Sequence, residues 1–273
     1  MKSRRTYLPA RAPAIAVVAA LLLPAMAVPA GAGPVPCAGR ADALGTARVL
    51  EVPAGVRVGT KSFPQTLPLA RGEVVLTFDD GPARGTTAAV LDALKAECVQ
   101  ATFFVIGANA RSHPQLVRRI VQDGHTLAHH SRTHPDATLA GLPFDAAVRE
   151  IEDGMVDDDV AAYGAAGPMP RVPFFRFPGF ASTPALLDYL ERRGIAVFGA
   201  DLWASDWNKM TPEQELSLVM SRLEASGGGI VLFHDTKSYT AAMIPAFLRA
   251  LAERGYRVVH VVPAPATPQQ RRN

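Results

Sequence analysis

The sequence predicts an α/β fold, a single distorted (β/α)7-type barrel preceded by a short β-rich arm. From Glu73 onward, apolar runs of strand length alternate with segments of helical length, which is the pattern of repeated βα units. In addition, polar side chains stand at the carboxyl ends of such runs, as at Asp79, Asp80 and His234, where α/β folds place their sites. The 273 residues are enough to bury the core of one large domain.

Residues 1–32 have the features of an export signal. The start is basic through four cations, Lys2, Arg4, Arg5 and Arg11. An apolar stretch at 12–28 then leads to small residues suited to cleavage. It is shorter than the ~20 apolar residues that a spanning helix needs, so we expect cleavage and no stable membrane span, with an uncleaved anchor as the alternative. Residues 3–8 also resemble a twin-arginine signal, and we expect export to the periplasm or the extracellular space.

Removal of this signal changes the charge balance. The chain has 28 Lys and Arg against 25 Asp and Glu, and the signal carries four of the cations and no acid. The remaining 24 basic and 25 acidic residues give a net charge of −1. This balance does not indicate a nucleic-acid partner.

Residues 33–72 are predicted to form an arm that packs on the following domain. They are punctuated by Gly and Pro and contain two short β-like pieces, Arg48–Val52 and Leu67–Leu69. The arm also holds Cys37, and the second cysteine of the chain is Cys98. In an oxidising compartment a disulfide between them is favoured, while a free Cys37 with a buried Cys98 thiol is the alternative.

The domain at 73–262 is predicted to contain seven strands and six helices. The strands are Val74–Phe78, Ala101–Ile106, His125–Ala128, Phe174–Phe177, Ile195–Gly199, Gly229–Phe233 and Tyr256–Val262. The helices are Thr86–Glu97, Pro114–Asp123, Phe144–Ala162, Pro184–Arg193, Pro212–Glu224 and Thr240–Arg254. Thr183 and Thr211 are typical helix N-caps, and Gln214 would complete a capping box with Thr211. Residues 263–273 are predicted to be a disordered tail.

Two adjacent carboxylates, Asp79 and Asp80, follow the first predicted strand of the domain. Gly81 and Pro82 then turn the chain, so the carboxylates lie at the carboxyl end of that strand. Asp-Gly-Pro is also a common turn sequence. These residues alone therefore leave a turn and a functional site as alternatives.

His130 and His134 follow the third predicted strand. A spacing of four would place both imidazoles on one face of a helical turn, where they could bind one metal ion. Such a pair alone is more often explained by solvated or core histidines. Together with Asp80, however, it makes two histidines and one carboxylate, which is typical of an open hydrolytic metal site.

A lone arginine, Arg176, lies inside an apolar run. If it is buried it needs a partner, and Asp79 is the natural candidate, whereas an edge arginine that reaches solvent is the alternative. We interpret Asp157–Asp159 as a solvated helix end. His129 is interpreted either as a residue that supports the histidine site or as a simple loop residue.

Five blocks of this sequence resemble the polysaccharide deacetylase family, which comprises the NodB-homology domains of carbohydrate esterase family 4. The blocks are Thr77–Pro82, His130–Pro135, Arg176–Gly179, Asp206–Trp207 and Leu232–His234. They occur in the order of the family within the domain at 73–262. The resemblance implies a divalent metal ion, with Zn²⁺ as the expected ion and Co²⁺, Ni²⁺ or Mn²⁺ as alternatives.

The resemblance also implies a role for each matching residue. The metal ligands would be Asp80, His130 and His134. The catalytic base would be Asp79, oriented by Arg176, and the general acid would be His234, partnered by Asp206. The acetyl group would be surrounded by Leu232, Trp207 and the backbone N–H of Gly179. Gly179 stands where family members often carry an aromatic residue, so we expect a side-chain wall to be lost there.

The chemistry of amide hydrolysis agrees with these roles. Arg176 should depress the pKa of Asp79, and Asp206 should raise the pKa of His234, so that a base and an acid coexist in one site. The sequence thus predicts a metal-dependent hydrolase that removes N-acetyl groups from an amino-sugar polysaccharide outside the cytoplasm. The alternatives are an O-acetyl esterase that acts on acetylated polysaccharide such as xylan, and a non-catalytic glycan-binding protein of the cell envelope.

Overall fold

The computed structural model describes residue 37, residue 40 and residues 42–265. The structural statements below concern these residues. The export signal predicted at 1–32 and residues 266–273 of the predicted tail lie outside them.

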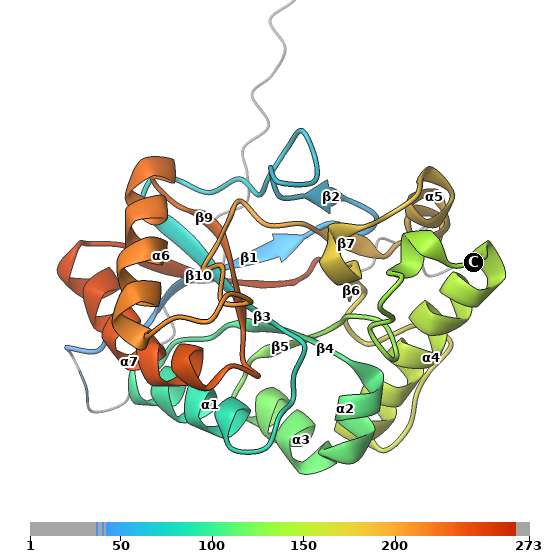
Figure 1. Ribbon diagram of the computed structural model, residues 1–273, viewed down its shortest axis with the longest axis horizontal. Coiled ribbons are helices and arrows are strands. Elements are labelled where there is room, and N and C mark those ends of the chain that lie inside the picture. Colours follow the sequence, from blue (N-terminus) through green and yellow to red (C-terminus); the bar gives the residue numbers. More distant parts are fainter. Residues whose placement is uncertain (1–36, 38–39, 41, 266–273) are drawn as a thin grey trace, which may run out of the picture. The chain divides into compact units, whose positions relative to one another are not determined.

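Ten strands form one sheet in the described part of the chain (Figure 1). They are β1 (Thr46–Val52), β2 (Arg57–Val58), β3 (Glu73–Asp79), β4 (Thr102–Val105), β5 (Thr126–His129), β6 (Phe174–Phe175), β7 (Ala196–Phe198), β8 (Leu202–Trp203), β9 (Gly229–His234) and β10 (Arg257–Pro263). Every paired set of neighbours runs parallel. Parallel strands joined by helices confirm the predicted α/β class.

Helices connect these strands and cover the sheet (Figure 1). They are α1 (Thr86–Ala96), α2 (Gly107–Ser112), α3 (Pro114–Gln122), α4 (Phe144–Tyr163), α5 (Pro184–Arg192), α6 (Pro212–Ser226) and α7 (Ser238–Glu253), with two short 3₁₀ turns, η1 (Leu139–Gly141) and η2 (Pro178–Phe180). Neighbouring helices contact one another in the order α6, α7, α1, α3, α4, α5. None of the helices in the described ranges is long and apolar enough to cross a membrane.

Seven strands follow one another in the row β8-β9-β3-β4-β5-β6-β7. The two ends of the row, β7 and β8, do not pair with each other in the described residues. β7 pairs instead with β2 of the arm, and β8 has β9 as its partner. A closed seven-stranded barrel is therefore not confirmed.

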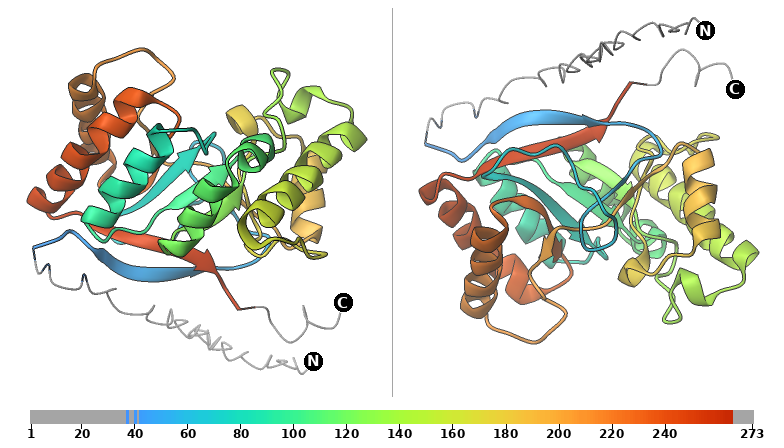
Figure 2. Two further views of the ribbon diagram at one scale, coloured as in Figure 1. Left: turned by 90° about the horizontal axis from the view of Figure 1, so that it is seen from below. Right: turned by 90° about the horizontal axis from the view of Figure 1, so that it is seen from above.

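The strand predicted at Tyr256–Val262 is present as β10 but lies outside this row. It pairs along its length with β1 and reaches only Glu73 and Val74 of β3. The reason is that β3 has two edges, of which β9 covers one, while β4 pairs with the other edge from Thr77 onward. Figure 2 shows β1 and β10 side by side. The seventh place in the row belongs to β8, a two-residue strand that is too short for a sequence pattern to reveal.

The predicted arm contributes β1 and β2 to the sheet. Arg48–Val52 lies in β1, as predicted. The strand predicted at Leu67–Leu69 is wrong, because this segment runs without strand pairing and Leu67 is buried as a core side chain. Cys37 and Cys98 form the favoured disulfide, with Cα atoms 5.5 Å apart, so the start of the arm is tied to the end of α1.

Alternate residues of β3 face two different cores. Leu76 and Phe78 pack into a buried cluster with side chains from the helices. Val75 packs instead into a second cluster with Phe104 and other strand residues. Since side chains alternate along a strand, Asp79 points to the same side as Val75, away from the helices.

The two predicted helix N-caps are confirmed. The Thr183 side chain accepts a hydrogen bond from the Leu186 N–H at the start of α5. At the start of α6, Thr211 and Gln214 form the expected capping box. These caps fix the residues at which the two helices begin, because each side chain satisfies a backbone N–H of the first turn.

Candidate active site

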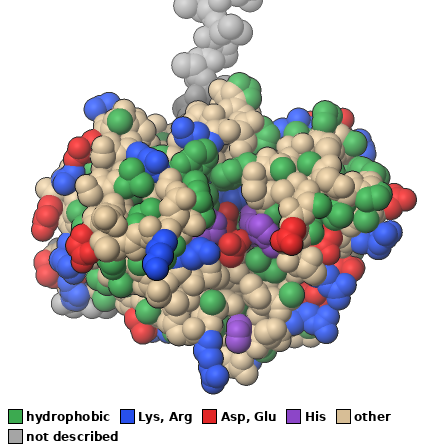
Figure 3. Space-filling view, viewed as in Figure 1, with side chains coloured by type: hydrophobic (Ala, Val, Ile, Leu, Met, Phe, Trp, Pro, Cys, Tyr) green, Lys and Arg blue, Asp and Glu red, His purple; other side chains and the backbone are tan. Residues whose placement is uncertain are grey.

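Site residues predicted from the sequence meet at the carboxyl ends of neighbouring strands. Asp79 ends β3 and His234 ends β9, and the two are register partners in this strand pair. His130 follows β5 directly, and Arg176 follows β6. Because the strands are parallel, these side chains reach the same edge of the sheet. In Figure 3, histidine and acidic side chains gather in a hollow near the centre of this face.

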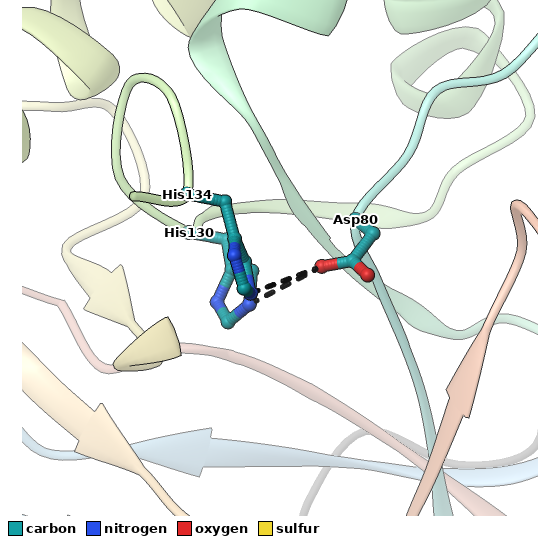
Figure 4. Close-up of side chains that lie close together, drawn as sticks. All are labelled: Asp80, His130 and His134. Carbon is teal, nitrogen blue, oxygen red and sulfur yellow. Dashed lines mark ion pairs between the residues drawn. The ribbon is translucent and has the colours of Figure 1, made fainter. Parts of the chain in front are cut away.

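Asp80, His130 and His134 form a cluster that fits a metal ion (Figure 4). Asp80 Oδ1 lies 3.5 Å from His130 Nε2 and 3.7 Å from His134 Nε2. One ligand atom from each residue lies within 4.8 Å of the others. Asp80 Oδ1 is buried and has no hydrogen-bond partner among the described residues. An unpartnered buried carboxylate oxygen is costly, so its position opposite two imidazole nitrogens indicates a cation ligand.

The backbone brings His130 and His134 together without a helix. The predicted helical turn is wrong, because residues 130–134 form a loop in which Ser131 and His134 have φ angles of 67° and 52°. The His134 N–H donates to Ser131 Oγ over 3.0 Å. These bends, rather than a helical period, place the two ring centroids 5.2 Å apart.

Helix α4 supports this loop. The Arg132 N–H donates to the Glu150 carbonyl oxygen over 2.8 Å. The Glu150 carboxylate accepts from the Thr133 N–H over 2.9 Å and from its hydroxyl over 3.0 Å. A Cβ on Gly154 would lie 2.6 Å from the Ser131 carbonyl carbon, so a glycine is needed where helix and loop touch. The Asp80–His130–His134 cluster thus depends on α4, although α4 supplies none of the three side chains of the cluster.

His130 is held in the tautomer that a metal ligand needs. Its Nδ1 donates to the Arg176 carbonyl oxygen over 2.8 Å, which leaves the Nε2 lone pair facing Asp80. Burial lowers the pKa of His130 to about 3, although Asp80 acts in the opposite direction. Two imidazole nitrogens with one carboxylate are a donor set that suits a divalent ion, so the residues present fit such an ion.

Arg176 is fully buried and pairs with Asp79, as predicted. Its Nη1 donates to Asp79 Oδ1 over 2.7 Å and to Thr77 Oγ1 over 2.9 Å. Its Nη2 donates to the Gly199 carbonyl oxygen over 2.8 Å. The burial excludes the alternative of an edge arginine. The other Asp79 oxygen, Oδ2, lies 4.0 Å from His130 Nε2 and therefore faces the metal cluster.

A low pKa of Asp79, expected from this pairing, is not found. Burial raises the pKa of the Asp79 carboxyl above its ordinary value, while Arg176 and His234 act to lower it. The expectation is wrong because the carboxylate loses its water on burial, and this penalty exceeds the attraction of one guanidinium. A divalent cation held by the neighbouring Asp80 cluster would act in the same direction as Arg176.

His234 and Asp206 form a second polar pair. His234 Nδ1 lies 2.7 Å from Asp206 Oδ1, and the His234 backbone N–H donates to Oδ2 over 2.6 Å. The Thr240 hydroxyl also donates to Oδ2, over 3.0 Å. Burial acts to lower the pKa of His234, but Asp206, together with Asp80 and Asp79, raises it to about 9, as expected. His234 Nε2 lies 3.8 Å from Asp80 Oδ2, so this nitrogen faces the metal cluster.

We expect the His234–Asp206 pair to stabilise the fold more in mild acid than in base. The pKa of His234 is raised from 6.5 to about 9 in the folded protein, so its contribution is complete below pH 6.5 and is lost as the pH rises through 9. The loss of unfolding free energy caused by His234→Gln, measured by urea denaturation, should shrink between about pH 6 and about pH 10. An equal loss at both values would contradict the raised pKa.

Leu232, Trp207 and Gly179, predicted to surround the acetyl group, lie at this edge of the sheet. Leu232 is buried in β9 two residues before His234. The Trp207 ring lies 6.2 Å from the His234 ring, and this residue is 50% exposed. Gly179 lies in η2, whose hydrogen bonds start from the next two N–H groups, so neither of them uses the Gly179 N–H.

Phe180 and Trp203 extend the apolar side of the site, and sequence reasoning missed them. The Phe180 ring stacks on Trp203 at 6.1 Å, and Trp203 contacts Trp207 at 5.7 Å. An aromatic ring is therefore present one residue after Gly179, beside the position where a side-chain wall is expected to be lost. The sequence contained the signal, because the Arg176–Gly179 block is followed by an aromatic residue, but only the turn shows where its ring lies.

A third missed residue is Asp235, which follows His234. It is fully buried and accepts a hydrogen bond from the Thr87 hydroxyl over 2.5 Å. Burial raises its pKa to about 7. A Cβ on Gly81 would lie 2.3 Å from Asp235 Oδ2, so the chain that carries Asp80 can pass this carboxyl only with a glycine. No motif in the sequence connects these two distant positions.

The solvated helix end predicted at Asp157–Asp159 is wrong. Asp158 and Asp159 are buried, and Asp158 Oδ2 lies 2.7 Å from His129 Nδ1. Burial raises the pKa of Asp158 well above its ordinary value and lowers the pKa of His129 to about 4. His129 therefore joins β5 to α4 directly beside His130.

Comparisons with known proteins identify relatives of this chain. The family model described as polysaccharide deacetylase matches residues 67–198. A chitooligosaccharide deacetylase of Sinorhizobium fredii is 32% identical over 196 residues, which are 67% of this chain and 87% of that protein. A peptidoglycan-N-acetylglucosamine deacetylase of Listeria monocytogenes is 30% identical over 69% of this chain and 38% of its own length.

A solved structure shows the same fold. The peptidoglycan deacetylase of Bdellovibrio bacteriovorus has a TM-score of 0.69 and 34% identity, with 80% of this chain and 58% of that chain covered. The sequence match to the rhizobial enzyme spans most of that protein, and the structural match covers four fifths of this chain. The chain therefore belongs to the polysaccharide deacetylase family.

Proposed function

We propose that the protein is a metal-dependent hydrolase that removes N-acetyl groups from an amino-sugar polysaccharide, peptidoglycan-like or chitin-like, outside the cytoplasm. The observation that carries this proposal is one site with three parts. The Asp80–His130–His134 cluster lies beside a buried Asp79–Arg176 pair on one side and faces the His234–Asp206 pair on the other. Metal, base and acid are the parts that hydrolysis of an unreactive amide requires.

Zn²⁺ is the ion that we propose for the cluster, with Co²⁺, Ni²⁺ or Mn²⁺ as substitutes. Two imidazole nitrogens and one carboxylate leave coordination positions open, as in hydrolytic zinc sites. When bound, such an ion polarises a carbonyl group and lowers the pKa of water to about 7 in favourable cases. Asp80, His130 and His134 would hold it, and the Arg176 carbonyl oxygen would keep His130 in the required tautomer.

Asp79 is proposed as the base and Arg176 as the residue that orients it. Arg176 uses one Asp79 oxygen and leaves Oδ2 facing the cluster, where it can accept the proton of the attacking water. The raised pKa of a buried carboxyl suits this step, because the carboxylate binds a proton more readily than a solvated one does. Arg176 is a positioning residue, since its guanidinium acts through Asp79 and its carbonyl oxygen acts through His130.

His234 is proposed as the acid. Its raised pKa keeps the proton on Nε2 near neutral pH, and Asp206 holds the ring through Nδ1. When the carbon–nitrogen bond breaks, this proton passes to the departing amine, and the acetyl group leaves as acetate. Asp79 has by then taken a proton from the attacking water. The site returns to its starting state when Asp79 releases that proton and His234 takes one up.

The acetyl group would lie between the backbone and the apolar side chains of the site. The Gly179 N–H is proposed to donate to the oxygen that becomes negative in the transition state. Leu232 and Trp207 would contact the methyl group, because both lie beside His234. The amide assignment is supported by the relatives, whose names describe deacetylases of chitooligosaccharide and of peptidoglycan N-acetylglucosamine.

We also propose that the protein acts after export, in the periplasm or outside the cell, with a twin-arginine route as one option. The support is the basic and apolar start of the sequence and the disulfide between Cys37 and Cys98, which is stable in an oxidising compartment. Peptidoglycan, the substrate named for one of the relatives, also lies outside the cytoplasm.

Acetate release from three substrates tests the proposal. Zn²⁺-loaded protein should release acetate from chitooligosaccharides or from peptidoglycan faster than from acetylxylan, and a chelator should abolish the activity. Faster release from acetylxylan would identify an O-acetyl esterase. No acetate from any substrate, with Asp79→Asn binding glycan as tightly as the wild type, would identify a glycan-binding protein instead.

A further inference from the structure

Asp206, the partner of the proposed acid, is itself held by polar side chains behind it. Its carboxylate contacts both Nδ1 and the backbone N–H of His234, at 2.7 Å and 2.6 Å. The Tyr239 hydroxyl donates to the Asp206 carbonyl oxygen. Thr240, which also lies on α7, places its hydroxyl 3.0 Å from Asp206 Oδ2. Because both carboxylate oxygens contact His234, a rotation of this one group would weaken both contacts.

Glu215 extends this network on the other side of Thr240. Its Oε1 lies 3.0 Å from the Thr240 hydroxyl, and Glu215, Thr240 and Asp206 are all fully buried. Glu215 lies near the start of α6, which packs against α7, so two helices meet at this hydroxyl (Figure 1). The other Glu215 oxygen, Oε2, is buried and has no hydrogen-bond partner among the described residues. The proposed reaction gives no role to this buried acid.

The single hydrogen of the Thr240 hydroxyl cannot serve two carboxylates. A threonine hydroxyl donates one hydrogen and accepts through the lone pairs of its oxygen. An oxygen of Asp206 lies on one side of this hydroxyl and an oxygen of Glu215 on the other, each at 3.0 Å. If both groups were ionised, one of them would face a lone pair, and two buried oxygens would lie in contact without a hydrogen between them. One of the two carboxyl groups must therefore carry a proton.

Glu215 is the better holder of this proton. Asp206 faces the imidazole of His234 and accepts its backbone N–H as well, and both contacts favour an ionised carboxylate. The Glu215 carboxyl has only the Thr240 hydroxyl as a hydrogen-bond partner among the described residues. Burial and the nearby Asp206 raise the pKa of Glu215 to about 7, although Thr240 and His234 act to lower it. The hydrogen bonds therefore run from Glu215 to Thr240 and from Thr240 to Asp206.

We propose that Glu215 holds a proton while Asp206 is ionised, and that Glu215 thereby positions the proposed acid. Glu215 donates to the Thr240 hydroxyl, and Thr240 in turn holds the Asp206 carboxylate against the imidazole of His234. Both are positioning residues, since they act only through Asp206 and the proton of Glu215 stays in place during turnover. This inference rests on the proposed function, because the role of His234 belongs to that function. Loss of the network should lower kcat rather than raise KM, because the imidazole delivers its proton only in the transition state.

Paired variants at both positions test this role. Glu215→Leu and Thr240→Val remove the polar group at a similar side-chain volume, whereas Glu215→Gln keeps a neutral donor and Thr240→Ser keeps the hydroxyl. The readout is acetate release from the N-acetylglucosamine pentamer by the Zn²⁺-loaded full chain at about pH 6, below the pKa of Glu215. In Glu215→Leu and Thr240→Val, kcat should fall about tenfold, with KM and bound metal unchanged. Glu215→Gln and Thr240→Ser should recover most of this loss.

Glu213→Leu is the matched control, because Glu213 lies in the same first turn of α6 but is exposed. It removes an acid from the same helix start and should leave kcat unchanged. Wild-type kcat in both Glu215→Leu and Thr240→Val would overturn the positioning role and leave the deacetylase standing. An equal loss of kcat in Glu215→Gln and Glu215→Leu would also overturn it, because a neutral donor would then not be sufficient.

Urea denaturation reports the proton of Glu215 without turnover. The folded protein keeps this proton up to about pH 7, whereas the unfolded chain releases it near the ordinary pKa of 4.5, so stability falls with rising pH across this interval. Glu215→Gln lacks this loss. Its urea midpoint relative to the wild type should therefore rise between about pH 5 and about pH 8, and that of Glu213→Gln should not. The titratable groups that face Glu215, which are Asp206, His234 and Tyr239, are common to these proteins.

The two measurements separate this inference from the proposed function. A rise of the relative midpoint without acetate release by the wild type would support a protonated Glu215 and contradict the deacetylase. A relative midpoint that stays constant with pH would contradict the protonated Glu215, whether or not acetate is released.

Discussion

Asp80→Asn is expected to abolish metal binding and acetate release together. Asp80 Oδ1 has no hydrogen-bond partner among the described residues and faces both histidines, so a neutral amide there removes the one negative ligand of the cluster. Asparagine tolerates the φ angle of 71° at this position, so the backbone should stay in place. Metal affinity, measured by titration of the metal-free protein, should fall more than about 100-fold.

Asp79→Asn is the matched variant at the neighbouring carboxylate. Asp79 pairs with Arg176 and lies farther from His130 than Asp80 does, so this variant should keep the metal and lose turnover. His234→Ala should behave in the same way, while His130→Ala should lose both. Stoichiometric metal in His130→Ala or in Asp80→Asn would contradict the ligand assignment. The two adjacent carboxylates are thus distinguished by metal content rather than by activity, since either change stops the reaction.

Arg176→Met is expected to destabilise the fold by about 3–5 kcal/mol and to abolish activity. Arg176 is fully buried and holds four acceptors, including Asp79. Its removal leaves a buried carboxylate without a countercharge, which is the most expensive part of the change. Urea denaturation of the two proteins under the same conditions measures the difference.

A double variant identifies the source of this cost. Asp79→Asn combined with Arg176→Met removes both charges, so it should be more stable than Arg176→Met alone, although both variants lack turnover. If the double variant is as unstable as the sum of the two single variants, the cost comes from lost packing around the guanidinium, which lies 4.2 Å from the centroid of the Phe104 ring. That outcome would contradict an electrostatic role for the pair.

Local patterns in the sequence predicted many of the elements and the pairings of the site. The apolar run before Asp79 predicts β3, and the threonine-proline pairs predict the starts of α5 and α6, because hydrophobic period and cap chemistry act within a few residues. A buried arginine needs a countercharge wherever it lies, so the pairing of Arg176 with Asp79 could also be inferred.

Other features depend on contacts between distant segments. β10 pairs with β1 because the edges of β3 are taken by β9 and β4, and no local pattern shows which edge is free. The left-handed loop at His130–His134 is held by Glu150 and Gly154 of α4. Sequence spacing alone therefore predicted the right pair of histidines with the wrong backbone.

By itself, the sequence determined which side chains are able to form the site: the carboxylates, imidazoles and guanidinium in five blocks, with the α/β alternation that brings them to strand ends. Only the tertiary structure decided their environment. It raised the pKa of Asp79, buried Asp158 against His129 and stacked the Phe180 ring on Trp203. The physical reason is that charge and shape are properties of a residue, whereas desolvation and strain arise only when distant segments pack around it.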